Sequence, residues 1–147
     1  MKSRGRAKAI PSSTGRQEKE RQSVLSLVMA VPKAIDARDK ETILGIYDTR
    51  DPSFCTFEDT PENQNRIDGA EFRKFIDGLG LLESSSIDRN DVRVDLVAND
   101  VAIVSGKDIW SSRISGKDTK GVSRFSIVFR KKKGEWKVIH EHFTKIA

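Results

Sequence analysis

The chain has 147 residues, of which 36% are hydrophobic and 33% charged, and its formal net charge is +5. This size and polarity are typical of a single soluble domain with one core. No apolar run approaches the roughly 18 residues of a membrane span, and no hydrophobic segment near the start resembles a secretory signal. We therefore expect neither a transmembrane nor an exported protein.

The net charge is concentrated near the N-terminus. Residues 1–21 contain seven basic and two acidic side chains, which gives +5, whereas the rest of the chain has 20 of each. Residues 1–17 have little apolar surface to bury, and such segments rarely offset the entropy lost on ordering. We predict a disordered basic tail over residues 1–17 and one folded domain over residues 18–147. Contact with nucleic acid or acidic lipid and a role as an organelle transit peptide stay open for the tail.

A first helix is predicted from Glu18 onward, because apolar residues recur there at helical spacing. This apolar stripe consists of Val24, Val28, Val31 and Ile35. Pro32 lies within the stripe and is expected to kink or split the helix, since proline removes one backbone hydrogen bond. Asp39 is a suitable N-cap for a short second helix.

A short strand and a third helix are predicted next. The strand follows Pro52 and contains Phe54 and Phe57. Asp68 and Glu71 have the spacing of a capping box, which predicts the start of a helix that Gly80 should end. The first half of the chain is therefore mainly helical.

The second half of the chain alternates apolar and polar residues, as strands do. We predict strands over residues 92–98, 101–110, 124–130 and 136–143. Residues 115–121 are predicted to be a polar connection. Three helices followed by antiparallel strands make an α+β fold. Several strands are apolar on both faces, which favours a homodimer that covers the outer face of the sheet.

The C-terminal residues carry a family resemblance. The strand Arg124-Phe125-Ser126 precedes the run Gly134-Glu135-Trp136-Lys137-Val138-Ile139-His140-Glu141-His142-Phe143-Thr144. This pattern, the order of the helices and the Asp68-Gly69 helix entry resemble the nuclear transport factor 2-like superfamily. Within it the chain is most similar to the SnoaL-like and ketosteroid-isomerase-like branch, and to the association (hub) domain of calcium/calmodulin-dependent kinase II.

The resemblance covers roughly residues 20–147 and implies a cystatin-like roll: a cone-shaped, curved antiparallel sheet packed on three N-terminal helices. Such a fold encloses a conical pocket and hosts many unrelated activities. In the ketosteroid isomerases a general-base Asp follows the first strand, and Asp59 matches that position. Val31 and Ser126 stand where the two oxyanion-hole donors would be and do not match them, so the resemblance does not extend to steroid isomerisation.

His140 and His142 are two residues apart on a predicted strand, which places them on one face together with Trp136 and Val138. The resemblance implies that this face is directed at the pocket. Three roles stay open for the histidines: hydrogen-bonded pocket residues, general acids or bases, or two ligands of a metal. No further ligand stands at a suitable spacing, so we predict no metal and no cofactor.

Further residues are assigned to the pocket. Arg124 is on an otherwise apolar strand and is either an ion-paired structural residue or the anchor for a ligand carboxylate. Tyr47, Phe57 and Trp110 are predicted to line the pocket. Cys55 is the only cysteine. We expect it to be a small buried apolar side chain in a cytoplasmic protein.

The favoured interpretation is a homodimeric SnoaL-like domain that binds a small polar or carboxylate-bearing ligand. One alternative is a lyase, isomerase or hydrolase with Asp59 or His142 as general base. Another is a hub-like oligomerisation module, which predicts assemblies larger than a dimer. We expect no nucleic-acid partner, because the basic run at 131–133 has no interleaved aromatic residues, and no membrane partner.

Overall fold

The structure is a computed structural model that describes residues 13–147. The first helix, α1, spans Ser13–Asp36. It therefore begins before Glu18, inside the segment predicted to be disordered, and the remainder of that segment lies outside the described residues. Helix α1 runs unbroken through Pro32. Val31 and Ala34 on either side are buried, and packing of this face outweighs the loss of one backbone hydrogen bond.

Two short helices follow, each with the N-cap that its sequence predicts. Helix α2 spans Lys40–Ile46, and the Asp39 side chain accepts a hydrogen bond from the Thr42 backbone N–H. Helix α3 spans Gly69–Asp77, and Asp68 accepts from the Glu71 backbone N–H at 2.9 Å. A 3-10 turn, η1, continues over Gly78–Leu81. Gly69 is required at the start of α3, since a Cβ there would lie 1.8 Å from the Thr49 carbonyl oxygen.

Five strands form one sheet in the order β1-β5-β4-β3-β2. They are β1 (Cys55–Asp59), β2 (Leu82–Ala98), β3 (Val101–Ile114), β4 (Lys117–Lys132) and β5 (Glu135–Lys145). Strand β1 is parallel to β5, and the other neighbours are antiparallel. The predicted α+β class with a curved, mainly antiparallel sheet on three helices is confirmed.

Strands β2 to β4 are longer than the sequence predicts. Strand β2 begins at Leu82 rather than near residue 92, and residues 117–121 belong to β4 instead of a loop. Ser115 and Gly116, with φ values of 50° and 73°, form the tight turn between β3 and β4, as in a type I′ hairpin. These strand ends are rich in Ser, Asp and Lys, so they lack the apolar alternation that predicts a strand.

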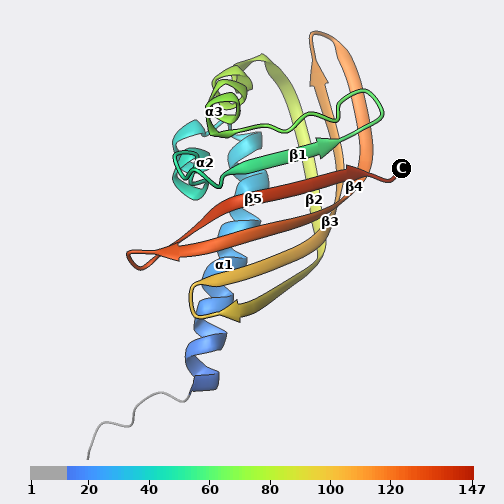
Figure 1. The fold of residues 1–147 in the computed structure, drawn as a ribbon. Coiled ribbons are helices and arrows are strands. Elements are labelled where there is room, and N and C mark those ends of the chain that lie inside the picture. The colour runs from blue at the N-terminus through green and yellow to red at the C-terminus, as the bar shows by residue number, and fades with distance from the viewer. Residues whose placement is uncertain (1–12) are drawn as a thin grey trace, which may run out of the picture.

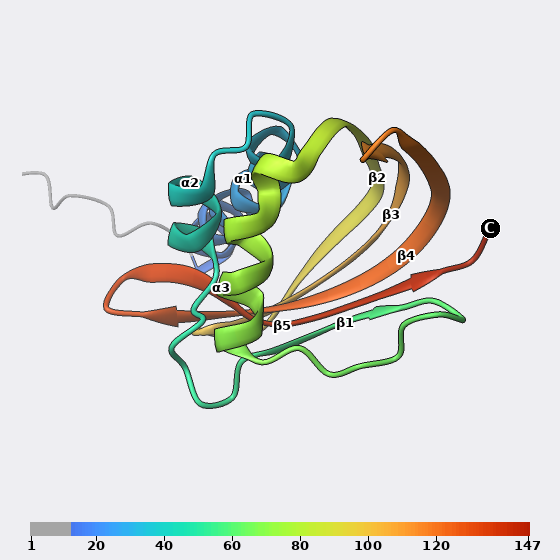
Figure 2. The same ribbon diagram turned by 90° about the horizontal axis from the view of Figure 1, so that it is seen from above.

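The sheet is strongly curved and the helices lie on its inner side. Figure 1 shows α1 crossing the sheet, and Figure 2, seen from above, shows the ends of β2, β3 and β4 bending round beside α3. The largest fully buried side chains come from α1, α2, β3, β4 and β5: Phe125, Phe129, Ile43, Ile127, Val24, Val28, Val104 and Val138. Within the described part of the chain, no helix is both long and apolar enough to cross a membrane.

Candidate functional site

A cavity of about 610 Å³ lies between the inner face of the sheet and the three helices. Its volume is in the range of sites that hold small molecules. The wall is mainly apolar and includes Val31, Ile43, Phe72, Ile76, Leu79 and Phe143. Charged and hydroxyl side chains from α2, β1, β2, β3 and β5 form the floor of this cavity, and the next paragraphs describe them.

The floor contains a buried ion pair between adjacent strands. Arg89 on β2 and Asp108 on β3 are register partners, and the Arg89 Nε and Nη2 atoms each donate to one Asp108 carboxylate oxygen at 2.9 Å. Arg89 Nη1 donates to the Val28 carbonyl on α1 at 2.9 Å. Burial alone would lower the pKa of Arg89, but the hydrogen bonds and charge of Asp108 outweigh it and hold that pKa above its ordinary value.

A second buried pair joins Tyr47, at the end of α2, to Glu141 on β5. The Tyr47 hydroxyl donates to the Glu141 carboxylate. Burial raises the pKa of Glu141 to about 7, although the Tyr47 hydrogen bond and the Arg89 charge act in the opposite direction. Burial, followed by the charge of Glu141, also raises the pKa of Tyr47 well above its ordinary value. Near neutral pH, Glu141 is therefore a carboxyl group that can gain or lose a proton.

Glu58 on β1 is the third acidic group of the floor. Its carboxyl group faces the cavity, and among residues 13–147 no hydrogen bond or ion pair to its side chain is present. Its side chain is exposed on the open side of the cavity. Desolvation by the neighbouring protein nevertheless raises the pKa of Glu58 above its ordinary value.

A β-bulge in β5 decides which side chains reach this cavity. Val128 of β4 pairs with His140 whereas the next residue, Phe129, pairs with Val138. Ile139 is therefore an extra residue in β5, and the alternation of faces shifts by one position beyond it.

The bulge places both histidines on the outer face of the sheet. Glu141 and Phe143 take the inner face and line the cavity, while His140 and His142 pair with outward-facing residues of β4. The prediction that the two histidines share the pocket face with Trp136 is therefore wrong. Strict alternation holds only in a strand without an additional residue, and β5 contains one at Ile139.

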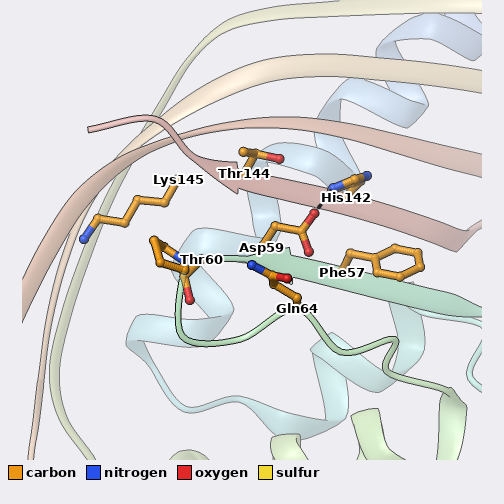
Figure 3. Close-up of a pocket in the computed structure, with 8 residues that line it drawn as sticks. Phe57, Asp59, Thr60, Gln64, His142, Thr144 and Lys145 are labelled. Carbon is orange, nitrogen blue, oxygen red and sulfur yellow. Dashed lines mark hydrogen bonds and ion pairs between the residues drawn. The ribbon is translucent and has the colours of Figure 1, made fainter.

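On the outer face, His142 and Asp59 form a close pair beside a shallow groove of about 560 Å³. The His142 Nε2 and Asp59 Oδ2 atoms are 2.6 Å apart. Figure 3 shows Asp59 and Phe57 on β1 next to His142 on β5, with the dashed line between the pair. Phe57, a predicted pocket residue, contacts the His142 ring on this outer face, at 5.3 Å between centroids.

The outer face also holds Cys55 and His140. The Cys55 Sγ and His140 Nδ1 atoms are 3.2 Å apart. Cys55 is half-buried rather than fully buried. Burial and the neighbouring His142 lower the pKa of His140.

The other predicted site residues are divided between the two faces. Tyr47 and Trp110 line the cavity, and the Trp110 indole donates to the Ser123 hydroxyl at 2.9 Å. Trp136 is on the inner face but away from the cavity, where its indole donates to Glu20 of α1. Arg124 is 57% exposed on the outer face, with Asp91 3.6 Å away. The pocket position predicted for Arg124 is therefore wrong, because it pairs with Lys107 and Thr144 on the outward register.

Sequence reasoning missed most of the polar floor. Arg89 lies outside the strands that the sequence predicts, so the sequence does not indicate that it pairs with Asp108. Glu58 precedes the residue that the family resemblance selected. A useful signal was the presence of single charged residues at inward positions of otherwise apolar strands, since such charges need a partner when buried. Among the described residues, no group of three His, Cys, Asp or Glu side chains is arranged to hold a metal ion.

Comparison with known proteins identifies a family. The model of the calcium/calmodulin dependent protein kinase II association domain matches residues 20–147. No curated protein is significantly similar to the chain.

Solved structures give the same fold. The association domain of C. elegans CaMKII is 26% identical, with a TM-score of 0.66, and the match covers 87% of this chain and 97% of that one. A dehydratase candidate of the nuclear transport factor 2-like (NTF2-like) family from Streptomyces avermitilis is 16% identical, with a TM-score of 0.76 and coverage of 89% and 99%. An NTF2-like protein from Cytophaga hutchinsonii is 16% identical, with a TM-score of 0.72 and coverage of 86% and 98%. These likenesses confirm the predicted resemblance to the NTF2-like superfamily.

Proposed function

Because the chain belongs to the calcium/calmodulin-dependent protein kinase II association domain family, we propose that it is a self-associating domain whose conical cavity binds a small polar molecule. One observation carries the binding proposal: an apolar-walled cavity of about 610 Å³ has titratable side chains at its floor. Sites of this composition hold small molecules, because apolar walls supply affinity and a few polar groups supply orientation.

Self-association is supported by the outer face of the sheet. Ile103 pairs with Val128, and Ile109 pairs with Val122, so four apolar side chains lie on this face. Ile103 and Ile109 are 40% and 48% exposed. Exposed apolar residues grouped on one face are typical of protein–protein contacts. The structural neighbour from C. elegans is itself named an association domain, and a homodimer or higher homo-oligomer accounts for both observations.

The binding proposal is tested by filling the cavity from one strand. Ser85 on β2 lines the cavity, whereas Ser84, the residue before it, is exposed and pairs with Arg113 on the outer register. We expect compounds that raise the melting temperature of the parent protein in a small-molecule screen to stabilise Ser84→Phe equally. The same compounds should not stabilise Ser85→Phe, because the phenyl ring occupies their site. Equal stabilisation of both variants by these compounds contradicts binding in the cavity.

A second candidate function is catalysis at the outer groove. The 2.6 Å contact between Asp59 and His142 favours it, because a carboxylate that orients an imidazole is a common general-base arrangement. The reaction class is that of a hydrolase, lyase or isomerase. A panel of activated esters tests the hydrolase case: loss of turnover in His142→Gln supports it, and turnover equal to that of the parent contradicts it.

A further inference from the structure

On the inner side of the lysines at its rim, the cavity has more acidic than basic side chains once its buried ion pair is considered. Asp108 balances the charge of Arg89, and three of the Arg89 nitrogens already donate to Asp108 and to the Val28 carbonyl. The remaining acidic residues that line the cavity are Glu58, Glu141 and Asp59, and Asp59 is paired with His142. The two lysines that line the cavity, Lys74 and Lys145, are exposed at its rim.

Glu58 is the group with unused binding capacity. Glu141 accepts from Tyr47, but the Glu58 side chain lines the cavity, is exposed there, and has no side-chain partner within residues 13–147. The charge of Glu58 contributes to the raised pKa of Glu141. A carboxylate in such a place is stabilised by a positively charged hydrogen-bond donor.

We propose that this cavity binds a small organic cation, an ammonium group on a non-polar body, with Glu58 as its anchor and Glu141 as the second carboxyl group. This inference rests on the proposed binding function and specifies its ligand class. The apolar wall would cover the body of the ligand, and the rings of Trp110 and Phe143 are part of that wall. Lys145 and Arg89 already lie beside these two rings, at 5.8 and 5.9 Å from the ring centroids, so the charge of the ligand is assigned to the carboxyl groups.

The same geometry disfavours the carboxylate-bearing ligand that the sequence suggested. That expectation depended on Arg124, which is exposed on the outer face of the sheet. Arg89 is the buried cation of the cavity, and its charge is already neutralised by Asp108. A ligand carboxylate at the floor would therefore meet Glu58 and Glu141, while Lys74 and Lys145 lie at the rim, and like charges in contact oppose binding.

The test uses three probes that share a phenyl ring and differ in the end group: 2-phenylethylamine, 2-phenylethanol and 3-phenylpropionate. Binding of each to the purified full-length protein is measured by calorimetry at pH 8, above the pKa of about 7 of Glu141. We expect the ammonium to bind about tenfold tighter than the alcohol, and the carboxylate to bind most weakly.

Two variants locate the anchor. Glu58→Gln keeps the shape of the side chain and removes its charge, so the preference for the ammonium over the alcohol should fall to near equality. Glu62→Gln removes the same charge from an exposed loop residue outside the cavity and should leave the preference intact. Equal losses in both variants would mean that only the overall charge matters, which overturns the role of Glu58.

The outcomes separate this inference from the proposed function. Tighter binding of the alcohol or the carboxylate to the parent protein overturns the cationic ligand but keeps a binding cavity. Failure of all three probes to bind at millimolar concentration overturns both. The ranking on the parent protein decides the ligand class even if Glu58→Gln does not fold.

Discussion

At the scale of single residues, the ionisable side chains at the floor of the cavity lower the free energy of unfolding. Glu141 is the clearest case, since burial raises its pKa from 4.5 to about 7. Between these pH values the folded protein holds a proton that the unfolded chain has lost, so the folded state loses stability as pH rises through this window. Glu58, whose pKa is also raised by burial, acts in the same direction. Binding sites often retain such destabilising groups because they serve the ligand.

Replacing Glu141 with glutamine tests this cost. A pKa shift of this size corresponds to about 3 kcal/mol, which the parent protein loses between pH 5 and pH 8. Glu141→Gln cannot ionise and still accepts the Tyr47 hydrogen bond, so most of this decline should disappear. Urea unfolding at the two pH values measures it. A variant that loses as much stability as the parent between pH 5 and pH 8 would contradict the assignment.

The Arg89–Asp108 pair gives a second prediction at this scale. Both side chains are almost fully buried, so Asp108→Asn leaves the Arg89 charge without its partner and should cost about 3–5 kcal/mol of unfolding free energy. The double variant Arg89→Met, Asp108→Leu removes both charges and should recover most of that loss. Urea denaturation compares the three proteins. A double variant no more stable than Asp108→Asn would show that the loss does not come from an unpaired charge.

At the scale of elements, local signals predicted the helices well. The caps at Asp39 and Asp68 act through neighbouring residues, so the sequence contains the whole interaction. The apolar stripe of α1 predicted its buried face for the same reason. Strands β2 to β4 were predicted too short because their polar ends owe their pairing to neighbouring strands rather than to alternation.

The candidate site was predicted less well because it depends on one extra residue in β5. The curved sheet that the family resemblance implies is present, and Tyr47 and Trp110 are among the residues that line its cavity. The bulge at Ile139 exchanges the two faces of β5, so Glu141 replaces His142 at the cavity. No local sequence signal marks that bulge, since β-branched residues such as isoleucine are common in regular strands as well.

At the scale of the whole molecule, the two faces of the sheet divide the proposed functions. The inner face and the helices enclose the cavity, and the outer face presents the apolar pairs Ile103–Val128 and Ile109–Val122. Self-association through the outer face therefore leaves the cavity intact. The outer groove with His142 and Asp59 lies on the same side as the proposed contact.

A charge on the outer face should disrupt self-association without unfolding the protein. Ile103→Glu places a carboxylate at the proposed contact, where desolvation of an unpaired charge is unfavourable. Met29→Glu is the matched control, because Met29 is 38% exposed on α1. By light scattering we expect the parent and Met29→Glu to have the same mass, two or more times the 16.5 kDa of one chain. The mass of Ile103→Glu should be smaller. A parent protein with the mass of one chain would contradict self-association.

The central claim is that ligands bind on the inner side of the sheet, and the two tryptophans of the chain test it directly. The Trp110 indole N–H lies at the cavity, whereas the Trp136 indole N–H is held by Glu20 away from it. Nitrogen–proton NMR spectra during a titration with 2-phenylethylamine report both indoles, and Trp110→Phe assigns them. We predict a saturable shift of the Trp110 signal with the Trp136 signal unchanged. A Trp110 signal that stays in place while the His142 ring signals on the outer face shift would contradict the claim.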